Sequence, residues 1–97
     1  MPSSYVSLPA ALASLRTEEE AAAFLTDLTT PAEQDALKER WRIANMLFEG
    51  GKSYRDIAAE TGASTTTVAR VARFLNSENN RGYQVLLERM ARMRRKK

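Results

Sequence analysis

Apolar residues recur every three or four positions over most of the 97-residue chain, with polar residues between them. Such spacing puts apolar side chains on one side of a helix. No stretch alternates apolar and polar residues for long enough to predict a strand. The pattern therefore predicts an all-α fold, with a short helix from near Pro9 and further helices over 18–28, 31–49, 54–61, 65–76 and from about Tyr83.

Capping signals mark where these helices start and stop. Thr17 is followed three residues later by Glu20, and Thr30 by Glu33, which is the spacing of a capping box. The paired glycines at 50–51 predict the end of the 31–49 helix. For that helix we expect an apolar stripe made of Leu37, Trp41, Ala44, Leu47 and Phe48.

Residues 53–72, SYRDIAAETGASTTTVARVA, have the spacing of a DNA-binding helix-turn-helix. Gly62 lies where the first helix must stop, because glycine adopts a left-handed conformation at no steric cost. We expect Ile57 to face the second helix, and Val68 and Val71 to form that helix's inner side. An ordinary helical hairpin also favours glycine at its turn and remains the simpler alternative.

The second helix of the motif has a predicted outward face. If Val68 points inward, steps of about 100° per residue turn Thr66, Arg70 and Arg73 outward. Hydroxyls there can bind phosphates or base edges, and arginines can bind guanine or phosphate. Phe74 falls on the flank, which favours burial against a second subunit. The candidate DNA-binding residues are Ser53, Arg55, Ser64, Thr65, Thr66, Thr67, Arg70 and Arg73.

The charge distribution supports a polyanionic partner. The net charge of +3 divides into 4 basic and 8 acidic side chains over residues 1–51, a net of −4, and 11 basic and 4 acidic over 52–97, a net of +7. The positive half contains the helix-turn-helix, so its field attracts nucleic acid. The tail over 94–97 is wholly basic and either touches phosphate or stays solvated.

Composition argues against an enzyme. The chain has no cysteine and no histidine, so thiolate chemistry and the commonest general base and metal ligand are excluded. The acids at 18–20 are adjacent on one helix and fan out to different sides. We therefore expect no catalytic residue, no cofactor and no metal site.

We expect a single helical DNA-binding domain over 1–97, with a flexible arm at 1–8, the helix-turn-helix at 53–76, and a C-terminal helix with a basic tail at 77–97. So short a chain has a marginal core, which favours oligomerisation. No secretory signal or membrane-spanning run is evident, so the sequence predicts a cytoplasmic protein.

Several segments together resemble the tryptophan repressor family. They are TPAE at 30–33, LKERWRIA at 37–44, the stretch 50–75 and LLE at 86–88. Over residues 15–90 the chain is most similar to the tryptophan-repressor-like branch called YerC/YecD. The resemblance implies a six-helix subunit in an intertwined homodimer, whose two motif helices enter successive major grooves of double-stranded operator DNA. It also implies transcriptional regulation, with repression by analogy to the family.

The resemblance also implies a ligand site. In members that bind tryptophan, two arginines sandwich the indole, and Arg40 and Arg70 match them here, while Thr67 matches a threonine of the pocket. However, Val71 stands where those members have glycine, and Phe74 replaces a serine. An indole packed against the valine costs about 1–3 kcal/mol. We therefore expect that tryptophan is not the effector.

Three functions stay open at this point. The first is a sequence-specific DNA-binding regulator, and the second is a helical protein-interaction module that never meets DNA. The third is a regulator in which Arg40 and Arg70 hold a different small carboxylate. The polar and basic face of the second motif helix favours the first.

Overall fold

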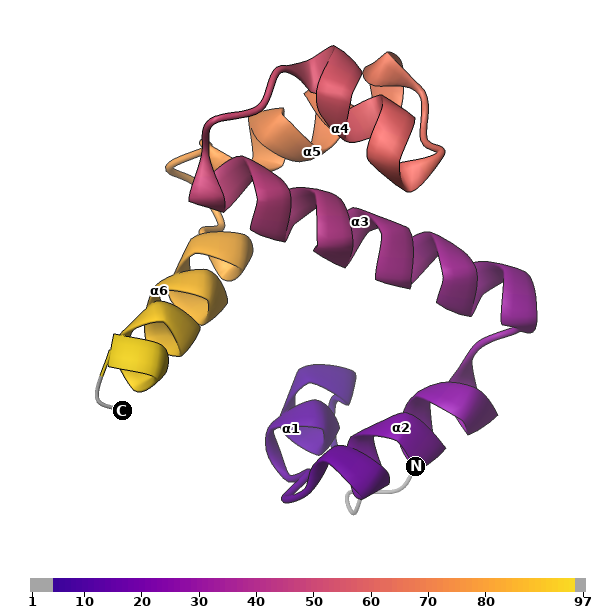
Figure 1. Cartoon of the computed structure of the whole chain (residues 1–97). Coiled ribbons are helices and arrows are strands. Elements are labelled where there is room, and N and C mark those ends of the chain that lie inside the picture. Colours follow the sequence, from indigo (N-terminus) through magenta and orange to yellow (C-terminus); the bar gives the residue numbers. More distant parts are fainter. Residues whose placement is uncertain (1–4, 96–97) are drawn as a thin grey trace. The chain divides into compact units, whose positions relative to one another are not determined.

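The computed structural model describes residues 5–95 (Figure 1), and the regular secondary structure in that range is all α-helix, with no strand, which confirms the all-α prediction. The six helices are α1 (Leu8–Ala13), α2 (Glu18–Leu28), α3 (Pro31–Glu49), α4 (Tyr54–Thr61), α5 (Thr65–Leu75) and α6 (Gly82–Arg95). They divide into two compact units at the bond between Asp35 and Ala36. Residues 1–4 of the expected arm and 96–97 of the expected basic tail lie outside the described residues.

The first unit contains α1, α2 and the first turn of α3. The Ser7 side chain accepts a hydrogen bond from the Ala10 amide at 3.3 Å, so α1 begins within the stretch predicted to be a flexible arm. At the start of α2, Thr17 accepts from the Glu20 amide at 3.0 Å. The Glu20 carboxylate accepts from the Arg16 amide instead of the Thr17 amide, so only half of the predicted capping box forms.

The start and end of α3 agree with the sequence prediction. Thr30 and Glu33 form a reciprocal box, in which each side chain accepts from the other residue's amide at 3.1 and 2.9 Å respectively. Gly50 and Gly51 follow the helix with φ of +78° and +88°, a conformation that residues with a Cβ rarely adopt.

The second unit is built around one buried apolar cluster to which α3, α4, α5 and α6 all contribute. The cluster consists of Ile43, Ala44, Ile57, Val68, Val71, Leu75 and Leu87. A Gln84 side-chain amide donates to the Leu75 carbonyl at 2.9 Å and joins the start of α6 to the end of α5. The core is therefore small but draws on every helix of this unit.

The predicted apolar stripe of α3 is only partly correct. Ala44 is buried, and Trp41 and Leu47 pack against the core cluster. Leu37 and Phe48, however, remain 42% and 37% exposed. The fully buried Ile43 was not part of the predicted stripe. The α3 residues in or against the core lie between Trp41 and Leu47, so Leu37 and Phe48 fall outside the packed segment and stay in solvent.

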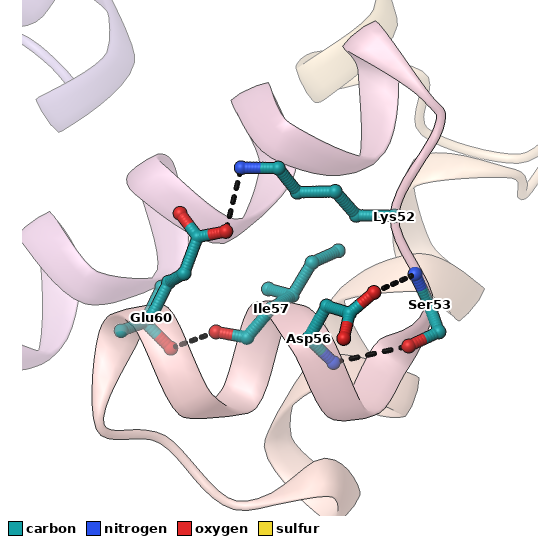
Figure 2. A network of polar contacts seen from close by, with 6 residues as sticks. Lys52, Ser53, Asp56, Ile57 and Glu60 are labelled. Atoms are coloured by element: carbon teal, nitrogen blue, oxygen red, sulfur yellow. Dashed lines mark hydrogen bonds and ion pairs between the residues drawn. The ribbon is translucent and has the colours of Figure 1, made fainter.

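Both helices of the helix-turn-helix form where predicted, although α5 ends at Leu75, one residue earlier than expected, and three residues join α4 to α5. Ser53 and Asp56 make a complete capping box at the start of α4, with distances of 3.0 and 3.3 Å (Figure 2). Gly62 ends α4 with φ of +83° in the left-handed region. In the same view, Lys52 and Glu60 form an ion pair of 2.7 Å beside α4. The start and the end of α4 are therefore determined by Ser53, Asp56 and Gly62, which occupy fixed positions of the motif.

Replacing Ile57 by alanine tests the weight of the buried cluster. Ile57 has no exposed surface, so Ile57→Ala leaves a cavity and lowers the free energy of unfolding by about 2–5 kcal/mol. Urea titration at a fixed protein concentration measures this loss. The exposed Ala59 of the same helix provides the control, since Ala59→Ser changes stability by about 0.5 kcal/mol or less. Equal losses for both variants would contradict the assignment of the core.

Candidate nucleic-acid interface

The burial pattern of α5 determines which of its faces meets solvent. Its buried residues are Val68, Val71, Ala72 and Leu75, all on the predicted inner side. Thr65, Thr66, Arg70 and Arg73 are exposed. The helix therefore presents two hydroxyls near its first turn and two guanidinium groups farther along, as the sequence predicted.

The first turn of α4 contributes two further exposed candidates, Ser53 and Arg55. The Ser53 hydroxyl oxygen accepts from the Asp56 amide at 3.0 Å, and its own hydrogen remains available to donate. A capping serine can therefore hold its helix and donate to a phosphate oxygen at the same time. Both residues lie at the start of α4, at the opposite end of that helix from the turn that leads to α5.

The N-terminus of α5 combines capping with a local field that favours anions. The Ser64 hydroxyl accepts from the Thr67 amide at 3.0 Å and lies 3.0 Å from the Thr67 hydroxyl. The partial positive charge of a helix N-terminus attracts phosphate. Thr67 is half-buried, so of the four predicted hydroxyl residues here it is the one least open to DNA.

Phe74 lies beside both outward arginines of α5. The guanidinium carbons of Arg70 and Arg73 are 5.6 and 5.8 Å from the centre of its ring, within the range of cation–π attraction. The ring itself is 45% exposed. The sequence placed Phe74 on the helix flank but did not connect it with the arginines. The spacing of four residues from Arg70 was the available signal.

A pocket of about 540 Å³ lies within the second unit, between residues of α3, α5 and the start of α6. It brings together Arg40, Thr67 and Arg70, the three residues predicted as a ligand site. Its other lining residues are Trp41, Val71, Phe74, Asn80, Arg81, Gly82, Tyr83 and Leu86. Arg81 and Tyr83 were not predicted as pocket residues, because their approach depends on how α6 packs against α5.

Val71 does not close this pocket. Its side chain is 2% exposed and belongs to the core cluster, yet open volume remains beside it. Arg81, another lining residue, has a backbone φ of +60°. Its guanidinium donates to the Gln84 side-chain oxygen at 3.0 Å and lies 3.9 Å from the Glu88 carboxylate. Cationic groups and apolar walls thus line one cavity, which is chemistry suited to an anion with an apolar body.

Over residues 5–95, no group of three or more acidic side chains is placed so that it can hold a metal ion. Nor does any helix in that range have the length and apolar character needed to cross a membrane.

Comparison with known proteins gives three agreeing results. The family model described as Trp repressor protein matches residues 3–91. The chain is 44% identical over 77 residues to the uncharacterized protein YerC of Bacillus subtilis (strain 168), covering 79% of this chain and 72% of that protein. Its fold is similar, with a TM-score of 0.77 and 43% identity, to the crystal structure of a TrpR-like protein from Eubacterium eligens ATCC 27750, covering 87% of this chain and 84% of the other.

Proposed function

The chain belongs to the Trp repressor family, and on that premise we propose that it is a homodimeric transcriptional regulator that reads the major groove of DNA with α5. The observation that carries the proposal is the outward face of this helix. Thr65, Thr66, Arg70 and Arg73 are exposed there, while the opposite face is buried in the core. Family analogy favours repression as the direction of control and the cytoplasm as its location.

Each part of the surface has a role in this proposal. The N-terminus of α5 approaches the base edges, where Thr65 and Thr66 bond a base or a nearby phosphate. The guanidinium groups of Arg70 and Arg73 can each donate two parallel hydrogen bonds, either to guanine O6 and N7 or to a phosphate. Ser53 and Arg55 at the start of α4 contact the backbone and set the register.

The proposed partner in the homodimer is a second copy, because much apolar surface of this chain is uncovered. Neither α1 nor α2 has a buried residue, and the described chain buries only eight side chains as its core. Surfaces of this kind mark protein interfaces. The exposed large apolar residues include Leu8, Leu12, Leu25, Leu28, Leu37, Phe48, Val85, Leu86, Met90 and Met93.

Selecting bound sequences from a random duplex pool with purified protein tests the DNA-binding function. The proposal predicts a palindromic consensus, because two symmetry-related α5 helices read two half-sites. Recovery of no enriched sequence would instead favour a protein-interaction module.

Once the consensus is known, Arg70→Ala and Arg73→Ala are each expected to weaken binding to it by about 1–3 kcal/mol, measured by fluorescence anisotropy.

The salt dependence of these variants separates the two roles open to an arginine. Loss of a phosphate contact reduces the slope of log K against log salt by about one per contact, whereas loss of a base contact relaxes the sequence preference. Arg16→Ala, at an exposed position just before α2, is the control and binds like the parent. If Arg70 and Arg73 variants also bind like the parent, the outward face is misassigned.

The pocket favours a second candidate function, in which a small carboxylate other than tryptophan modulates the regulator. Arg40 and Arg70 both line the cavity and offer charged donors to a carboxylate. Although the cavity stays open beside Val71, Val71 and Phe74 leave less room in it than the smaller residues of tryptophan-binding members, and this difference argues against the indole as ligand.

Calorimetric titration distinguishes these ligands. We expect no saturable binding of L-tryptophan at micromolar concentration, since the two larger side chains oppose an indole. Phenylacetate serves as the probe for a smaller aromatic carboxylate. We expect it to bind the Arg40→Ala variant more weakly than it binds the parent. Saturable micromolar binding of L-tryptophan would overturn the proposal that this amino acid is not the effector.

A further inference from the structure

We propose that Phe74 is a positioning residue, whose ring holds Arg70 and Arg73 ready for DNA so that operator binding requires no small ligand. The inference rests on the proposed DNA-binding function. It starts from one observation: both outward arginines of α5 lie within 6 Å of the centre of one ring, at 5.6 and 5.8 Å. The ring and both arginines belong to the same helix, so the contact does not depend on a second subunit or on a ligand.

The exposure of Phe74 indicates that its role is the contact with the arginines and not packing in the core. Phe74 is 45% exposed and adds nothing to the buried cluster of the second unit. Packing within the subunit therefore does not account for an aromatic side chain at this position, and the contacts that the structure shows for it are with the two arginines rather than with the second subunit expected from the sequence. Exposing a large apolar side chain to solvent costs free energy. The attraction between the ring and the two guanidinium groups offsets part of that cost.

A cation–π contact leaves an arginine able to bind DNA. The ring attracts the charge of the guanidinium without accepting from its five N–H donors, which lie in the guanidinium plane. Arg70 and Arg73 can therefore stay against Phe74 while their donors reach a base edge or a phosphate.

Holding two long cationic side chains in place also lowers the cost of binding. A free arginine loses much rotamer freedom when it is immobilised at an interface. The ring reduces that loss before DNA arrives, and it also offsets the mutual repulsion of two like charges three residues apart on one helix. The arginines are thus arranged by the chain itself.

This arrangement bears directly on ligand dependence. Phe74 and Arg70 line the pocket that an effector would enter, so an aromatic group already lies beside Arg70 in the free chain. An added aromatic ligand is not needed to order this guanidinium. The parent protein is therefore expected to bind its operator without any added ligand, and L-tryptophan is expected to leave that affinity unchanged.

The test uses the full chain and the duplex selected from the random pool. Phe74→Leu keeps an apolar side chain but removes the ring, and it weakens operator binding by about 5- to 20-fold. Phe74→Tyr keeps the ring face and binds within about 2-fold of the parent. Tyr5→Leu is the control, because it also removes an exposed aromatic ring, at a residue 79% exposed and outside the surfaces proposed for DNA and for the second subunit; it binds like the parent.

A double-mutant cycle separates positioning from a general structural effect. If the ring acts through Arg73, the effects of Phe74→Leu and Arg73→Ala are not additive, and the double variant binds little worse than Arg73→Ala alone. Thermal unfolding and sedimentation confirm that each variant is folded and has the parent's oligomeric state. Additive effects, or a Phe74→Leu variant that binds like the parent, would overturn the inference.

The outcomes also distinguish this inference from the function on which it rests. If the parent enriches no DNA sequence, the proposed function fails, and Phe74 has no arginines to position for DNA. If the parent binds a palindromic duplex but only when a small ligand is added, the function stands and the inference fails.

Discussion

The packing of α4 against α5 through Ile57 and Val68 is the constraint on which the rest of the structure depends. Both side chains are completely buried and belong to the cluster that also contains Ile43 of α3. Because Val68 points into this cluster, the opposite face of α5 must point to solvent. The chemistry of the protein follows from that orientation, since the exposed face has hydroxyl and guanidinium groups and no acidic residue.

Much of the fold could be predicted because its determinants are local. The capping box at Ser53 and the left-handed Gly62 gave the bounds of α4 and the start of α5 from residues only a few positions apart. Features that depend on contacts distant in the sequence were predicted less well. The burial of Ile43 and the exposure of Leu37 reflect where other helices meet α3, which periodicity along one helix does not reveal.

The candidate site shows the same division. The outward direction of Arg70 and Arg73 followed from helical geometry, and the structure confirms that both are exposed. The pocket residue Arg81, by contrast, reaches its position because α6 is joined to the end of α5 by the bond from Gln84 to the Leu75 carbonyl. The three residues predicted as a ligand site and Phe74 line the same pocket, so the proposed effector and the proposed DNA contacts involve neighbouring side chains.

The most direct test of the central claim, that the outward face of α5 is the DNA-reading surface, is to follow the backbone amide resonances of the isotope-labelled protein during titration with the selected duplex. The account predicts that the largest changes fall on residues 64–73, with a second group at 53–56 where α4 begins. Changes concentrated on α6, with the amides of α5 unaffected at saturation, would contradict it.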